Sequence, residues 1–88
     1  MPGVVRQGDK NSEGGAAVSG VSSVLVNNRP IVVDGTPVSP HRPRGHVGKI
    51  TASGLSNVIA GNKPVNIIGN PDNCGHPRVE GSGDVVAG

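Results

Sequence analysis

The sequence predicts a small all-β domain made of three copies of one hairpin unit. The chain has 88 residues, and residues 19–37 align without gaps on residues 53–71, while a shorter third copy occupies residues 80–88. Fifteen glycines and eight prolines leave almost no uninterrupted stretch in which a helix could form. A repeat of this kind carries more weight than any local pattern, and we interpret the whole chain, residues 1–88, as one domain.

Each full copy has the pattern of a β-hairpin. A short run rich in Val, Ile and Ser leads to a two-residue turn, and the returning run begins with a basic residue and proline. The two turns are Asn27-Asn28 and Gly61-Asn62. Asn and Gly tolerate the positive φ angles of a type I′ turn, which is the turn that suits two antiparallel strands.

The third copy lacks a returning strand, and the start of the chain supplies a match for it. Residues 4–9 match residues 31–36 and 65–70. We therefore interpret the chain as a circular permutation of three units, in which residues 4–7 pair antiparallel with residues 84–87. Such closure removes free strand edges and gives the domain approximate pseudo-threefold symmetry.

The composition indicates that burial alone leaves this domain little stability. Its apolar residues are mostly Val, Ile and Ala, and it has no Phe, Tyr or Trp, the residues that usually bury the most area each. Ordering the chain costs about 1.5 kcal/mol per residue, so an additional staple is expected. The single cysteine, Cys74, cannot form a disulfide within the chain, which leaves a metal ion or a partner.

The side chains best suited to bind a metal lie in two of the three connections between hairpins. His41 and His46 lie in the second connection, residues 35–54, and Cys74 and His76 lie in the third, residues 69–81. Threefold geometry would bring these connections together at one end. Three imidazoles and one thiolate fill a tetrahedral zinc site with no open position, as in structural sites, and iron is the alternative metal.

Other functional interpretations are weaker. A Cys/His hydrolase would need a third orienting group and a pocket, and no glycine-rich segment is followed by the helix that a phosphate cradle needs. The net charge of +2 comes from scattered residues without aromatic neighbours, so we expect no nucleic acid partner and no enzymatic activity. The acidic residues at turn positions should bond local backbone amides. They are Asp9, Asp34, Asp72, Glu80 and Asp84.

The sequence shows no signal for membrane insertion or export. No apolar run approaches the 18 or so residues of a membrane span, and residues 1–4 lack the basic and then apolar start of a signal peptide. We expect the protein to be made in the cytoplasm and to stay there until another machine carries it out.

Residues 50–64 and 72–88 resemble the recurring units of the PAAR-repeat family, in which glycine-serine, an apolar strand, asparagine-glycine and basic-proline follow one another. The resemblance spans essentially the whole chain and is strongest from Pro37 onward. It implies a sharp β-cone with zinc held near the apex by three His and one Cys. By position these ligands are His41, His46, Cys74 and His76.

Two features depart from the family pattern. The literal Pro-Ala-Ala-Arg motif is absent, since residues 30–33 read Pro-Ile-Val-Val and residues 64–67 read Pro-Val-Asn-Ile. Many members carry a histidine in the first unit, where this chain has Glu13. Glu13 is therefore the reserve ligand, should His41 point away from the site.

The resemblance implies a structural protein. One chain would cap a trimeric β-helical spike protein and sharpen it for piercing the target cell envelope, either in a phage virion at the tip of the tail spike or through a type VI secretion system. The alternative is an adaptor that links effector cargo to the spike. The face toward the spike should be apolar and opposite to the zinc loops, with its corners at residues 27–28, residues 61–62 and the Met1/Gly88 junction.

Overall fold

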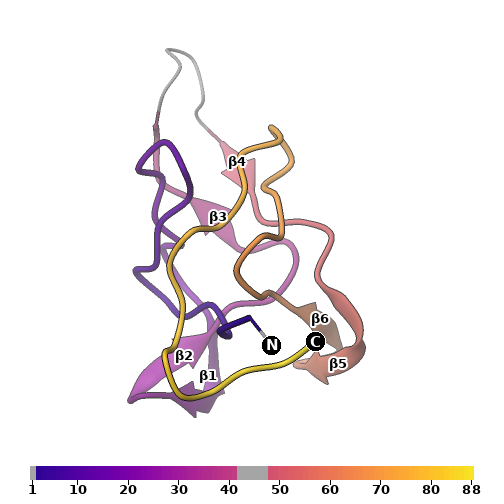
Figure 1. Cartoon of the computed structure of the whole chain (residues 1–88). Helices are drawn as coiled ribbons and strands as arrows, with labels where there is room; N and C mark the ends of the chain where they lie inside the picture. The colour runs from indigo at the N-terminus through magenta and orange to yellow at the C-terminus, as the bar shows by residue number, and fades with distance from the viewer. Residues whose placement is uncertain (1, 42–47) are drawn as a thin grey trace.

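The computed structural model describes residues 2–41 and 48–88, and that part of the chain is all-β. Its strands form two-stranded antiparallel sheets (Figure 1). The strands of these sheets are β1 (Val21–Val26) with β2 (Arg29–Ile31), β3 (Pro37–Val38) with β4 (Lys49–Ile50), and β5 (Leu55–Ala60) with β6 (Lys63–Val65). The small all-β class predicted from the sequence is confirmed. Over the same residues, no helix has the length and apolar character needed to cross a membrane.

The two full hairpins have the turns that the sequence predicts. Asn27 and Asn28 have φ angles of 54° and 66°, and Gly61 and Asn62 have φ angles of 54° and 65°. Two successive positive φ angles are the mark of a type I′ turn. The register also shifts at matching places, between residues 21 and 25 in one hairpin and between residues 55 and 59 in the other. The repeat in the sequence therefore corresponds to a repeat in local structure.

The two ends of the chain pair antiparallel, although the register differs from the prediction. Gly3 is bridged to Val86, and the amide of Val4 donates to the carbonyl of Val85 at 2.9 Å. The N-terminal partner of residues 85–87 is thus residues 2–4 and not residues 4–7. The reason is that the backbone of residues 5–7 is already bonded to other segments of the fold.

Those bonds join three matched segments in a ring. The amide of Val5 donates to the carbonyl of Asn66 at 2.9 Å, Asn66 donates to Val32 at 2.9 Å, and Val32 donates back to Val5 at 3.0 Å. All three residues are completely buried. Each segment therefore gives one hydrogen bond to a neighbour and receives one from the other neighbour, so none of the three is left with an unpaired edge here.

Small aliphatic side chains fill the space between this ring and the hairpins. The cluster contains no residue larger than isoleucine, in line with the composition. Its buried members are Val4, Val26, Ile31, Val33, Ala60, Val65 and Ile67.

The connections also pair with one another, at the end of the molecule opposite to the hairpins (Figure 1). Each connection folds back on itself through a short antiparallel contact. The bridged pairs within connections are Lys10 with Ala16, Pro37 with Ile50, and Pro71 with Pro77. The bridged pairs between connections are Asn11 with Arg78, Val38 with Ala17, and Asp72 with Thr51. The molecule measures 32 × 23 × 22 Å, and the hairpin end and the connection end lie at opposite ends of the view.

Candidate metal centre

Three side chains from two connections meet at the connection end. His41 follows β3 in the second connection, whereas Cys74 and His76 lie in a tight turn of the third. In that turn the amide of Gly75 donates to the carbonyl of Asp72 at 2.9 Å, and the amide of Asp72 donates to the carbonyl of His76, also at 2.9 Å. Gly75 has a φ angle of +91°, which a residue with a side chain rarely adopts. The backbone thus places Cys74 and His76 on the same side of one loop.

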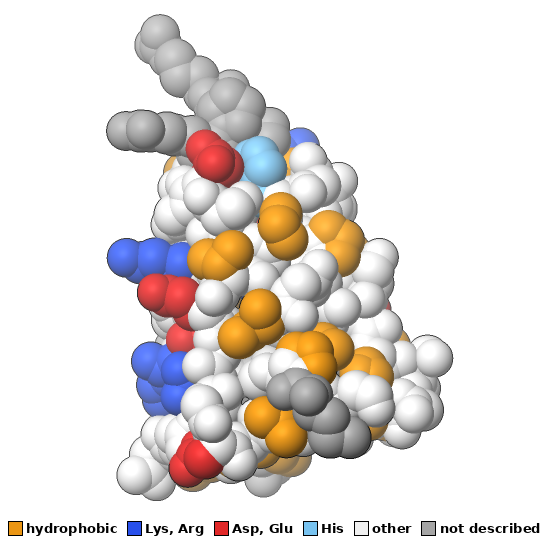
Figure 2. All heavy atoms as spheres, viewed as in Figure 1, with side chains coloured by type: hydrophobic (Ala, Val, Ile, Leu, Met, Phe, Trp, Pro, Cys, Tyr) orange, Lys and Arg blue, Asp and Glu red, His pale blue; other side chains and the backbone are white. Residues whose placement is uncertain are grey.

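The ligand atoms of the three residues converge. They all lie within 4.8 Å of one another, and each residue is partly buried. The Nε2 atom of His41 is 3.4 Å from the Sγ atom of Cys74, and Sγ is 3.6 Å from the Nδ1 atom of His76. The two imidazole rings are in edge-to-face contact with centroids 5.1 Å apart. Figure 2 shows a histidine side chain at this narrow end of the molecule.

A hydrogen bond fixes the orientation of the His41 ring. Its Nδ1 atom is 2.8 Å from the carbonyl oxygen of Ser39. A carbonyl oxygen only accepts, so Nδ1 carries the proton, and in the neutral ring the lone pair is on Nε2, the atom that faces Cys74. Metal-bound histidines are commonly held by such a bond from the other ring nitrogen.

The two sulfur–nitrogen distances suit a tetrahedral ion. With a zinc–sulfur bond of about 2.3 Å and a zinc–nitrogen bond of about 2.0 Å, tetrahedral geometry separates sulfur from nitrogen by about 3.5 Å. The two sulfur–nitrogen separations here are 3.4 Å and 3.6 Å. One thiolate with two imidazoles is also the mixed donor set that zinc accepts readily. The residues therefore fit a transition metal ion that completes its coordination with a further ligand.

Comparison with protein families agrees with this arrangement. The family model described as the PAAR motif matches residues 7–87. The chain belongs to the PAAR-motif family. A search of curated protein sequences found no significant match. This family is associated with the spike tips of contractile injection machines in phage tails and type VI secretion, which is a structural role, and metal binding is general in it.

The four ligands predicted for this PAAR-motif chain divide into two groups. His41, Cys74 and His76 lie together as described. His46 lies outside the described residues. Glu13, the reserve ligand, is exposed and is not a member of the group. It was to replace His41 if that side chain pointed away from the site, but His41 points toward Cys74.

Directly beside the metal loops lies a buried ion pair that the sequence did not suggest. Arg78 is completely buried, and its Nη1 atom is 3.1 Å from the Oδ1 atom of Asp72. Asp72 also accepts a bond from the Nδ2 atom of Asn11 at 2.5 Å, and Arg78 donates to the backbone carbonyl of Asp9. The pair thus joins the first connection to the third. The bridges of the folded chain place Arg78 at the position where the other connections have the buried residues Ala17 and Thr51.

Of the five acidic residues, only Asp9 bonds a local backbone amide as predicted, whereas Asp34 and Glu80 bond amides distant in the sequence and Asp72 and Asp84 bond side chains. Asp9, Asp34 and Glu80 accept bonds from the backbone amides of Arg6, Gly54 and Lys10. The carboxylate of Asp72 instead bonds the side chains of Arg78 and Asn11, and the carboxylate of Asp84 bonds those of Asn27 and Ser82. The reason is that both lie where another segment approaches closely enough to supply a donor.

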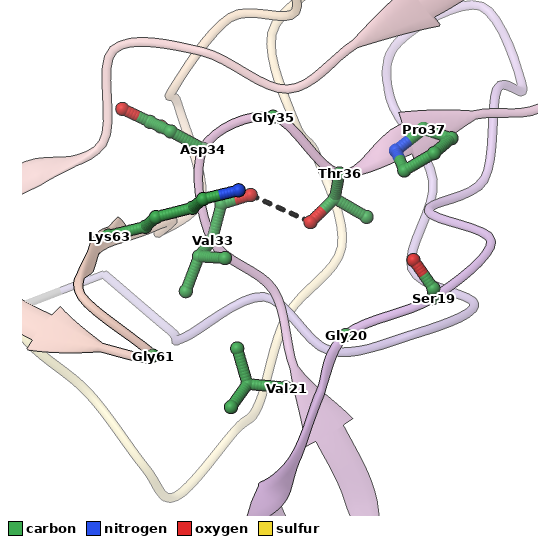
Figure 3. Close-up of a pocket in the computed structure, with 10 residues that line it drawn as sticks. All are labelled: Ser19, Gly20, Val21, Val33, Asp34, Gly35, Thr36, Pro37, Gly61 and Lys63. Carbon is green, nitrogen blue, oxygen red and sulfur yellow. Dashed lines mark hydrogen bonds between the residues drawn. The ribbon is translucent and has the colours of Figure 1, made fainter.

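A pocket between the two full hairpins contains none of the metal group (Figure 3). Its walls come from the start of β1, residues 33–37 and the turn before β6, and Asp34 and Lys63 are its charged residues. The Oδ1 atom of Asp34 is engaged by Gly54 and Asn66, and the hydroxyl of Thr36 donates to the carbonyl of Val33 at 2.7 Å. Asp34 and Thr36 therefore serve the local fold.

Proposed function

We propose that this chain is the metal-fixed tip of a trimeric spike in a contractile injection machine. It seats its hairpin end on the blunt end of a trimeric β-helix, one chain per trimer, and presents its metal end toward the target envelope. The observation that carries the proposal is the set of exposed aliphatic side chains at matched positions of the hairpin end, opposite to the end that holds the ligand group. Val18, Ile50 and Val79 in the connections are exposed as well but are not at matched hairpin positions.

Exposed aliphatic residues occur at matched positions of the three units. Leu25, Ile59 and Val86 are 57%, 55% and 45% exposed. Each is followed by a small apolar residue that packs in or against the core, namely Val26, Ala60 and Ala87. The alternation places one row of side chains in the core and leaves the next row facing out. A monomer gains nothing from such exposure, so these residues are the natural contact for a partner.

The ring of backbone bonds through residues 5, 32 and 66 supports a threefold partner. A chain whose three segments are joined head to tail in this way presents similar corners in three directions. The blunt end of a trimeric β-helix offers three matching edges, whereas a twofold partner offers two. An interface of about 800 Å² per side is sufficient for stable capping.

At the opposite end, His46 completes the ligand set of His41, Cys74 and His76, and the ion is zinc, with iron as the alternative. The bound ion would tie the second connection to the third. Four protein ligands leave no position for water or substrate, so the role of this site is structural.

The proposal is tested by binding to the cognate spike protein. Leu25→Asp and Ile59→Asp place charges in the contact and should weaken binding by about tenfold or more each, because a carboxylate must then lose its water. The matched control is Val18→Asp, since Val18 is 50% exposed but lies in the first connection. The mass of the complex should correspond to one chain per three spike subunits. Equal binding by all variants, or three chains per trimer, would contradict the proposal.

A further inference from the structure

We propose that Gly15 is a positioning residue of the metal centre, because its missing side chain leaves the space that the His41 imidazole occupies. A Cβ atom at Gly15 would lie 2.5 Å from Nδ1 and 2.8 Å from Cγ of His41. Separations below 3.0 Å force one of the two groups to move. The inference rests on the proposed metal site and adds to it a residue from the first connection, which contributes no ligand to the group described above.

Gly15 itself cannot move away easily. Its amide donates to the Oδ1 atom of Asn11 at 2.8 Å, and its carbonyl accepts from the amide of Asn11 at 2.8 Å. The Nδ2 atom of Asn11 is bonded to Asp72, which is paired with the buried Arg78. Because this network is buried and fully engaged at Asn11, an added side chain at Gly15 would displace His41 rather than the backbone.

The His41 ring is fixed relative to Gly15 by three further bonds. Its Nδ1 atom donates to the carbonyl of Ser39, and the amide of Ser39 donates to the carbonyl of Ala16, the residue after Gly15, at 2.8 Å. The Oγ atom of Ser39 also accepts from the amide of Ala16 at 2.9 Å. The first connection thus clamps the residues that carry His41, and the ring lies directly against Gly15.

The repeat explains why a glycine stands here. Residues 8–20 align without gaps on residues 69–81, so that Gly14 falls on Gly75 and Gly15 falls on the ligand His76. Gly14 and Gly75 both have positive φ angles, of 86° and 91°. The first connection therefore repeats the turn of the third connection but has empty space at the ligand position. His41 from the second connection fills that space and brings Nε2 to 3.4 Å from the Cys74 sulfur.

The test compares Gly15→Ala with Gly14→Ala. Nothing lies within 4 Å of a Cβ atom at Gly14, but its positive φ makes alanine strained, so this control costs stability without touching His41. We expect Gly15→Ala to weaken Zn²⁺ affinity, measured by competition with a chromophoric chelator, by about tenfold or more. The absorption bands of the Co²⁺-loaded protein should change as well. Gly14→Ala should keep the affinity and the spectrum while lowering the melting temperature of the metal-free protein.

A second pair of variants covers the case in which Gly15→Ala fails to fold. The double variant Gly15→Ala/His41→Ala should fold. Its metal affinity should equal that of His41→Ala alone, because the imidazole that clashes with the added Cβ atom is then absent. The Cγ1 atom of Val38 also lies 2.8 Å from the added Cβ atom. If Val38→Ala restores the metal affinity of the Gly15→Ala variant, the clash is at Val38 and the inference is overturned. If the unaltered protein binds Zn²⁺ and Gly15→Ala binds it equally well, this inference fails alone. If the unaltered protein binds no metal, the proposed function fails.

Discussion

The carboxylate of Asp9 joins the first connection to the first hairpin. Its Oδ2 atom accepts from the amide and from Nε of Arg6 at 2.8 Å and 3.0 Å, and its Oδ1 atom is 2.5 Å from an Nη2 nitrogen of Arg29 in β2. Burial raises the pKa of Asp9, but the hydrogen bonds from Arg6 and the charge of Arg29 together bring the pKa below the ordinary value of 3.8. This carboxylate is therefore more acidic in the folded protein than in the unfolded chain.

The lowered pKa gives a stability that depends on pH. Asp9 contributes its full stability above about pH 4, and the contribution is lost as the pH falls through the folded-state pKa. Asp9→Asn should lower the free energy of unfolding at pH 7 by about 1–3 kcal/mol, since it removes hydrogen bonds to a charged group. The difference from the unaltered protein should shrink toward pH 2. Urea unfolding with chelator present isolates this effect from the metal ligands, and a difference that stays constant with pH would refute the assignment.

Close to the metal group, the first connection contacts the second and the third through interactions of different chemistry. On one side the contact is a backbone bridge between Val38 and Ala17, and on the other it is made by the bonds of the buried Arg78 and Asp72 to Asp9 and Asn11 in the first connection. A buried ion pair is weak evidence for stability by itself, because both charges lose their water. Its value here is geometric, since Asp72 begins the loop that carries Cys74 and His76.

Breaking that pair from one side should be costly. Arg78→Met leaves the Asp72 carboxylate buried without its partner, and we expect the free energy of unfolding to fall by about 3–5 kcal/mol. Adding Asp72→Asn should recover part of the loss. Arg29→Met is the matched control, because the Arg29 side chain is 41% exposed and the Asp9 carboxylate keeps its bonds from Arg6, so we expect a loss of about 1 kcal/mol. Equal losses for Arg78→Met and Arg29→Met in chemical denaturation would show that the buried pair has no special role.

At the scale of elements, the sequence predicts the hairpins well because their determinants are local. The turn residues at 27–28 and 61–62 favour the two positive φ angles of a type I′ turn, which both turns have. The predicted register at the chain ends was wrong. A hairpin pattern gives each strand one partner, whereas the backbone of residues 5–7 bonds two other segments of the fold. Arg78 was missed because arginine is rarely buried, so its burial shows only once the segments around it are placed.

The three clustered side chains could be listed from the sequence, but their geometry could not be predicted from it. Histidine and cysteine are few enough that their confinement to two connections is informative. The contact between Gly15 and His41 lies between connections, and a glycine gives no chemical signal of its own. Sequence reasoning could list Cys74, His76 and His41, but only the fold shows that their ligand atoms lie within 4.8 Å of one another.

At the scale of the whole molecule, the small aliphatic core stabilises the hairpin end more than the connection end. The hairpin end is held by the ring of backbone bonds and by the packed side chains of Val26, Ile31 and Val65. The connection end has few apolar residues to bury, and Gly14, Gly48 and Gly75 all take positive φ angles there. A bound ion contributes stability where burial cannot, since the free energy of binding stabilises the folded state. A metal ion bound by His41, Cys74 and His76 would thus be part of the fold.

The most direct test is the metal content of protein purified without chelator, together with its melting temperature. We predict one zinc or iron ion per chain, and a melting temperature that falls when the ion is removed. Cys74→Ser keeps the size of the side chain but replaces the thiolate with a poor zinc ligand, so this variant should lose the ion and melt near the temperature of the metal-free protein. Unaltered protein that contains no transition metal, or that melts at the same temperature with and without chelator, would contradict the account.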